Sequence, residues 1–103
     1  MKYMLVELHL GFHTVLVVVM KVLLFGPARD AMDCSVIDVH LTTPISVLAL
    51  RHAIDSKFPD LRTVLKKSIF ALNNKLVPRV AEDATNISEE SAELVLVPPV
   101  SGG

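Results

Sequence analysis

The chain ends in Pro98-Pro99-Val100-Ser101-Gly102-Gly103, and this ending is the part of the sequence best suited to chemistry. Proline donates no backbone N–H and has a fixed φ, so the pair Pro98-Pro99 stops a preceding strand and begins a stiff, extended tail. Six residues span at most about 20 Å, which is long enough to enter a narrow channel in a partner. The glycines leave bare backbone at the end, so the reactive group offered is the carboxylate of Gly103. The alternative is an inert, frayed terminus.

The other side chains that could do chemistry form no such group. Cys34 is the single cysteine, so no intrachain disulfide can form, and no neighbouring base marks its thiol as a nucleophile. His9 and His13 have the i,i+4 spacing that suits a metal on a helix, but no cysteine or carboxylate completes a ligand set. We therefore expect no metal site and a partly buried, unreactive thiol.

The composition fits one small domain with a buried core. The chain has 103 residues, of which 51% are hydrophobic and 20% charged, and its formal charge of -1 gives no reason to expect nucleic acid. No Lys or Arg stands between Val80 and Gly103, where the acidic residues are Glu82, Asp83, Glu89, Glu90 and Glu93. We expect either a solvated acidic loop or a surface that steers the tail toward a basic partner.

The first 19 residues are expected to be an extension ahead of the domain. The uncharged stretch from Leu8 to Met20 is only 13 residues long, which is short for a membrane span. Lys2 and an apolar stretch are typical of a signal peptide, but Glu7 interrupts them and no small-residue cleavage site follows. We expect a cytoplasmic protein, with the β-branched run Val15–Val19 lengthening the first strand of the domain.

Alternation of apolar and polar residues predicts the first elements of the domain. Residues 21–25 form a strand that a Gly-Pro pair stops, and because Lys21 marks the solvent side, Phe25 on the same face points outward. Residues 28–33 form a turn or a single helical turn. Residues 35–41 form a second, half-buried strand.

One amphipathic helix follows these strands. Thr42-Thr43-Pro44 predicts its start, with a hydroxyl cap and a proline in the first turn. The helix ends near Pro59, and its apolar stripe consists of Val47, Leu50, Ile54 and Phe58.

Further strands follow the helix. Residues 68–72 form a strand, Asn73-Asn74 form a hairpin turn because asparagine tolerates positive φ, and Leu76–Val77 return as a short strand. Residues 80–91 form a polar loop, either irregular throughout or with one short helical turn. Residues 93–97 form the last strand, with Leu94 and Leu96 facing inward and Glu93, Val95 and Val97 facing outward.

This order predicts an α+β fold, a mixed sheet with one main helix packed across it and the last strand in the middle. Such an arrangement is the β-grasp, or ubiquitin-like, fold. We expect residues 1–19 to be a dispensable extension, residues 20–97 the domain and residues 98–103 an extended reactive tail. The outward apolar residues that would make a contact patch beside the tail are Phe25, Leu76 and Val97.

Residues 20–103 resemble the small subunit of molybdopterin synthase, the sulfur carrier of molybdenum cofactor biosynthesis. The resemblance is carried by Lys21-Val22-Leu23-Leu24-Phe25 with Arg29 four residues on, by Val47-Leu48-Ala49-Leu50-Arg51, and by Leu94-Val95-Leu96-Val97 with the Pro-Pro-Val-Ser-Gly-Gly ending. The ending is the most specific, because other ubiquitin-like sulfur carriers usually keep Gly-Gly without Pro-Pro. The family commonly has an aromatic residue where Val97 stands.

The resemblance implies a non-catalytic carrier subunit of a sulfurtransferase complex. An activating enzyme would use ATP to adenylate Gly103. Sulfur donation would then replace AMP and leave a thiocarboxylate on Gly103, the residue after Gly102. The tail that carries the thiocarboxylate would insert into the large subunit, where sulfur is transferred to cyclic pyranopterin monophosphate to make molybdopterin. No cofactor would be bound permanently.

The resemblance also implies the partners. The small and large subunits form a heterotetramer, two of each, and neither nucleic acid nor membrane is expected to bind. The residues expected to contact the partner are Phe25, Leu76, Val97, Pro98, Pro99, Val100 and Ser101.

Three alternatives stay open from the sequence. The chain could be a sulfur carrier for thiamine or for tRNA thiolation. It could be a ubiquitin-like modifier joined to lysines of other proteins. It could also be a β-grasp interaction module that makes no use of its terminus.

Overall fold

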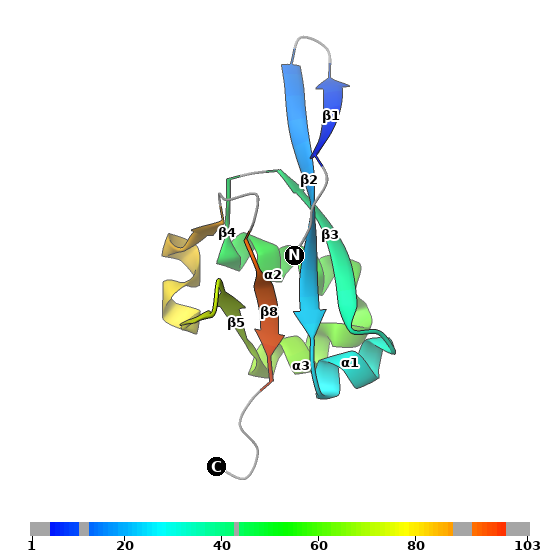
Figure 1. The fold of residues 1–103 in the computed structure, drawn as a ribbon, viewed down its shortest axis with the longest axis vertical. Coiled ribbons are helices and arrows are strands. Elements are labelled where there is room, and N and C mark those ends of the chain that lie inside the picture. The colour runs from blue at the N-terminus through cyan, green and yellow to red at the C-terminus, as the bar shows by residue number, and fades with distance from the viewer. Residues whose placement is uncertain (1–4, 11–12, 43, 88–91, 99–103) are drawn as a thin grey trace.

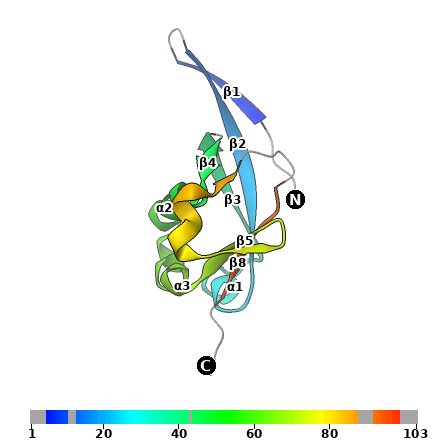
Figure 2. The same cartoon turned by 90° about the vertical axis from the view of Figure 1, so that its left-hand side faces the viewer.

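A computed structural model describes residues 5–10, 13–42, 44–87 and 92–98 of the chain. The main sheet carries helices on one face (Figures 1 and 2). In chain order the elements are β1 (Leu5–Leu10), β2 (His13–Leu24), α1 (Pro27–Met32), β3 (Val36–Thr42), β4 (Ile45–Ser46), α2 (Val47–Lys57), η1 (Pro59–Leu61), α3 (Arg62–Lys67), β5 (Ile69–Leu72), β6 (Lys75–Val77), η2 (Arg79–Ala84), β7 (Asn86–Ile87) and β8 (Leu94–Val97).

The main sheet is mixed, and its last strand in sequence lies in the middle. The strand order is β1-β2-β8-β5-β6, and β3 pairs with β2 in addition. β8 runs parallel to β2 and antiparallel to β5, so each of its edges has a neighbour. β1 and β8 each share paired residues of β2 with β3: Val17 and Val18 pair with both β1 and β3, and Val22 and Leu23 pair with both β3 and β8. β3 therefore lies on the edge of β2 opposite to β1 and β8. The central position predicted for the last strand is confirmed.

The hydrophobic core lies between the sheet and the helices. Side chains alternate along each strand, so Val22 and Leu24 of β2 and Leu94 and Leu96 of β8 are buried on one face, as predicted. Figure 2 shows α2 and α3 on one side of the sheet, and the buried α2 residues of the predicted stripe are Val47, Leu50 and Ile54. No helix in the described ranges is long and apolar enough to cross a membrane.

The predicted helix start is wrong. α2 begins at Val47 and is capped by Ser46, whose side-chain oxygen accepts a hydrogen bond from the backbone N–H of Ala49 at 3.0 Å. Pro44 instead precedes β4, a two-residue strand that pairs with β7. The pairing partner lies some forty residues away in the chain, so the local Thr-Thr-Pro pattern could not reveal it.

Other predicted elements are close to those observed. Asn73 and Asn74 both have positive φ, at 52° and 68°, and join β5 to β6 as a hairpin. β2 starts at His13, so the Val15–Val19 run does lengthen the first strand. The strand ends at Leu24, one residue before its predicted end, because the chain turns into α1.

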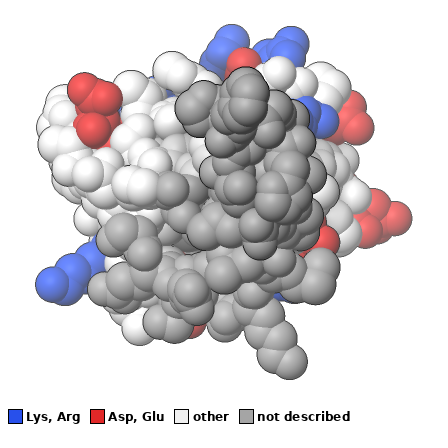
Figure 3. Space-filling model, turned by 90° about the horizontal axis from the view of Figure 1, so that it is seen from above, with Lys and Arg blue, Asp and Glu red and all other residues white. Residues whose placement is uncertain are grey.

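The molecule is elongated along one axis. The molecule measures 53 × 28 × 22 Å, with the β1–β2 hairpin at one end of the long axis and the end of β8 near the other (Figure 1). Figure 3 looks along this axis from the hairpin end and shows basic and acidic side chains interspersed at the periphery of the described surface.

A buried ion pair that no local sequence pattern indicated joins α2 to η2. The Arg51 guanidinium donates to both carboxylate oxygens of Glu82, at 2.8 Å from Nε and 2.7 Å from Nη2. It also donates to the backbone carbonyls of Leu65 and Ser68 and lies 5.1 Å from the ring centroid of Phe70.

The expectation of a wholly solvated or partner-steering acidic segment is therefore wrong for Glu82, which is fully buried. Asp83 is exposed and Glu93 is partly exposed, as a solvated segment requires. Glu89 and Glu90 lie outside the described residues.

Removing the Glu82 carboxylate should strongly destabilise the fold. Glu82→Ala leaves the buried Arg51 charge without its partner, and such a loss costs about 3–5 kcal/mol of unfolding free energy. Urea denaturation measures the change. The matched control is Asp83→Ala, which removes an exposed carboxylate one residue away and should change stability by less than about 0.5 kcal/mol. Equal effects of the two substitutions would contradict this role.

Candidate functional site

The C-terminal tail leaves from a well-held point of the sheet. Leu96 of β8 lies opposite Leu24 of β2, and Val97 lies opposite Ile69 of β5, so β8 is paired on both edges through Leu96 and on the β5 edge to its end. Pro98 follows, and because it has no N–H it cannot extend the ladder. The tail residues predicted to be reactive or partner-binding, Pro99, Val100, Ser101, Gly102 and Gly103, lie outside the described residues.

The turn between β2 and α1 borders the base of the tail. Gly26 has φ 54° and ψ −128°, a conformation that residues with a side chain rarely adopt. A Cβ on Gly26 would lie 3.7 Å from Cγ of Pro98. The Gly26 carbonyl accepts a hydrogen bond from the Asp30 N–H at 3.0 Å, which ties the turn to α1. The sequence marked Gly26 as a strand stop and gave no signal of this contact.

The predicted patch residues share the sheet face that points away from α2. Phe25 follows the buried Leu24 and is 50% exposed, Leu76 is 59% exposed, and Val97 is partly exposed and follows the buried Leu96. The register links them, because Leu76 lies opposite Ala71, Ala71 opposite Val95, and Val95 opposite Leu23. We call this surface the open-face patch; it consists of Leu23, Phe25, Ile69, Ala71, Leu76, Val95 and Val97.

The open-face patch begins at the point where the tail leaves. β2 and β8 are adjacent and parallel. Val97 ends β8 directly before Pro98, and Phe25 follows the end of β2 directly before Gly26. An exposed apolar surface of this kind is suited to contact with another protein. The structure thus brings Phe25 and Val97 together, with Leu76 two strands from Val97 on the same face.

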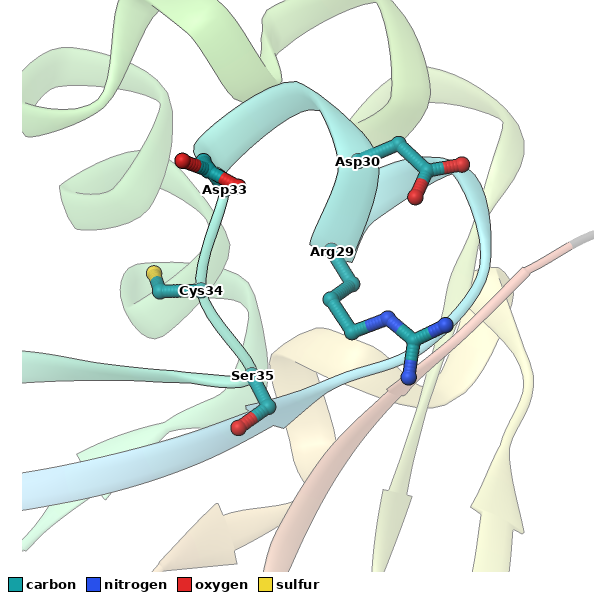
Figure 4. A pocket seen from close by; sticks show the side chains of 5 residues that line it. All are labelled: Arg29, Asp30, Asp33, Cys34 and Ser35. Carbon is teal, nitrogen blue, oxygen red and sulfur yellow. The ribbon is translucent and has the colours of Figure 1, made fainter.

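A small open hollow lies beside α1 at the same end of the molecule (Figure 4). Arg29 and Asp30 come from α1, and Asp33, Cys34 and Ser35 come from the turn that leads to β3. Figure 4 shows the Arg29 side chain extending toward β8, whereas the Cys34 thiol points to the other side. The lining carries both signs of charge, so it does not define a site for one class of ion.

The described side chains do not form a catalytic group. Among them, no hydrogen bond joins a histidine to Cys34 or to a serine hydroxyl. Within the same residues, no cluster of histidine, cysteine or carboxylate groups is arranged to hold a metal ion. What the described surface offers is a rigid exit for the tail and an apolar docking face.

Comparisons with known proteins agree with this geometry. A model of the ThiS family matches residues 22–103. The solution structure of the HVO 2177 protein of Haloferax volcanii superposes with a TM-score of 0.65 and 17% sequence identity, covering 82% of this chain and 88% of that one. The mixed sheet crossed by one main helix and this likeness confirm the predicted α+β, β-grasp fold. No curated protein matches the sequence.

The backbone at Gly26 should tolerate no side chain without a cost. Gly26→Ala forces an L-residue into a conformation that costs about 1–3 kcal/mol, and we expect that loss of stability in urea denaturation. The signals of Val97 and Pro98 in nuclear magnetic resonance spectra should shift with it. The control, Asp30→Ala, changes an exposed side chain in the same turn. A Gly26→Ala protein as stable as this control would show that the turn relaxes freely.

Proposed function

The chain belongs to the ThiS family of ubiquitin-like sulfur carriers, and from this premise we propose that it is the sulfur-carrying small subunit of a molybdopterin synthase. The observation that carries the proposal is the ending Pro98-Pro99-Val100-Ser101-Gly102-Gly103. Sulfur carriers of this fold usually end in Gly-Gly, whereas the Pro-Pro pair before it is typical of the molybdopterin branch.

The proposed chemistry begins at the Gly103 carboxylate, which is a poor electrophile until it is activated. An activating enzyme joins this carboxylate to the α-phosphate of ATP and releases pyrophosphate. A sulfur donor then displaces AMP from the acyl carbon, and the terminus becomes a thiocarboxylate. Its sulfur is ionised near neutral pH and follows the reactivity of a thiolate, so it needs no base from its own chain.

The described part of the chain supports this role by fixing where the tail starts. β8 is paired on both edges through Leu96 and on the β5 edge at Val97, so the base of the tail is a fixed point on the docking face. Five residues follow Pro98, and they can reach at most about 17 Å into a partner. Gly102 and Gly103 allow the backbone to pass a constriction, because they have no side chains.

The partner proposed for the open-face patch is the large subunit, in a heterotetramer with two copies of each chain. There the sulfur would pass to cyclic pyranopterin monophosphate. Phe25, Leu76 and Val97 supply the apolar contacts, with Pro98 beside them at the base of the tail. The activating enzyme needs the same terminus and so must approach from the same end.

Deletion of Gly103 should abolish sulfur transfer without changing the fold. The terminal acyl carbon would then belong to Gly102, one residue short of both active sites. We expect no molybdopterin from the deleted chain mixed with activating enzyme, sulfur donor and large subunit, and an unchanged thermal unfolding midpoint. After the full chain has reacted with the activating enzyme and the sulfur donor, its intact mass should show replacement of one oxygen by sulfur. An active deletion variant would refute the proposal.

Leu76→Ser should weaken binding of the large subunit and leave the isolated chain folded, because Leu76 is already 59% exposed. Loss of a buried interface leucine is expected to raise Kd by about tenfold, or 1.4 kcal/mol. Isothermal titration calorimetry measures the affinity. Val80→Ser is the matched control, since Val80 is an exposed apolar residue on η2, outside the patch. Equal affinities of Leu76→Ser and Val80→Ser would remove the patch from the interface.

A further inference from the structure

A second hollow lies on the helical side of the molecule, away from the open-face patch. Its volume is about 210 Å³, several times the roughly 30 Å³ that a water molecule occupies in the liquid. Three elements that are distant in the sequence converge on it. Its lining residues are Arg51, His52 and Asp55 from α2, Leu65 and Lys66 from α3, and Arg79 from the start of η2.

Two of the charged groups at this hollow are already neutralised. Arg51 is 5% exposed and paired with Glu82 through two hydrogen bonds. Asp55 accepts a hydrogen bond from Nε of Arg62 at 3.1 Å. Each of these pairs brings one positive and one negative charge, so neither gives the hollow a net charge.

Two positive charges at the hollow remain uncompensated. Nε of Arg79 lies 3.7 Å from the Glu82 carboxylate, but that carboxylate is already matched by Arg51. The Lys66 ammonium forms no ion pair with any of the described carboxylates. His52 is exposed at the rim and can add a further donor.

Arg79 is held in position by the protein before any ligand arrives. Its Nη1 donates to the backbone carbonyl of Lys66 at 2.9 Å, and its Nε faces the buried Glu82 carboxylate. Ordering a long side chain normally opposes binding, so a guanidinium that is already ordered binds an anion at a lower entropic cost. Its remaining N–H groups are donors only, so the group they bind must be a hydrogen-bond acceptor.

We propose that this hollow is a binding site for a phosphate-sized oxyanion, either free phosphate or the phosphate group of a small ester. Glu82 alone faces both Arg51 and Arg79, and Lys66 has no carboxylate partner among the described residues, so the hollow has an excess of positive charge that suits a dianion. An ordered guanidinium in a hollow that Lys66 also lines can donate to tetrahedral oxygen acceptors. The site is separate from the tail and the open-face patch, so it does not depend on the function proposed above.

The test is a titration of the ¹⁵N-labelled full chain with sodium phosphate, at fixed pH and with ionic strength held constant by sodium chloride. The expected result is saturable shifts of the backbone amides of Arg51, His52, Lys66 and Arg79. Because a hydrogen bond to a charged group contributes about 1.5–3 kcal/mol, Lys66→Gln combined with Arg79→Gln should raise Kd at least about tenfold. The matched control is Lys57→Gln with Lys75→Gln, which removes two exposed charges outside the hollow and should leave Kd within about twofold.

The outcomes separate a site from general attraction. Equal weakening in the two double variants, or shifts that chloride alone reproduces, would overturn the proposal. Acetate binding as tightly as phosphate would overturn the assignment to a dianion. Titration with AMP distinguishes the sources: the same amides shift if a phosphate ester is accepted, and only inorganic phosphate shifts them if the free ion is the ligand. Lys66→Gln alone keeps the contacts of Arg79 and should still raise Kd about tenfold, so the test stands if the double variant does not fold.

Discussion

The position of β8 between β2 and β5 is the constraint on which the rest of this structure depends. A strand with neighbours on both edges cannot shift its register without breaking two ladders at once. Leu94 and Leu96 add to this, because a slip of one residue would move both from the core to the open face. The base of the tail is therefore fixed in position and direction. A tail on an edge strand would lack this precision.

The Arg51–Glu82 pair closes the chain segment that returns to this central strand. Between β6 and β8 the chain crosses the helical side as η2 and β7, and Glu82 is the residue by which η2 is fixed to α2. Arg51 also holds the carbonyls of Leu65 and Ser68, at the junction of α3 and β5. One side chain thus joins three segments, and the ring of Phe70 beneath it belongs to β5, the strand next to β8. A buried charge is tolerated here because each nitrogen of the guanidinium has an acceptor.

Local patterns in the sequence predicted the fold class well and long-range partners poorly. The faces of β2 and β8 follow from alternation, which each strand carries within itself, and the turn at Asn73-Asn74 follows from residue type. The start of α2 was misplaced because β4 exists only through pairing with β7. Glu82 was predicted to lie on the surface because the residues around it do not indicate an ion pair with Arg51, which lies 31 residues earlier. Contacts of that kind are decided by the assembled fold.

The same distinction explains what could be predicted of the candidate site. Phe25 and Val97 could be assigned to an outward face because each belongs to, or directly follows, an alternating strand, whereas the short strand of Leu76 has no such alternation. The proximity of Gly26 to Pro98 could not be predicted, because it requires β2 and β8 to be adjacent and parallel. The two residues are 72 positions apart, and no local pattern indicates that pairing. Parallel pairing places the turn after β2 beside the tail after β8, and a glycine there keeps the space next to Pro98 free. If the chain works through its last backbone atom, as we propose, it needs this open exit more than a catalytic side chain of its own, since the activating and the accepting sites would then belong to its partners.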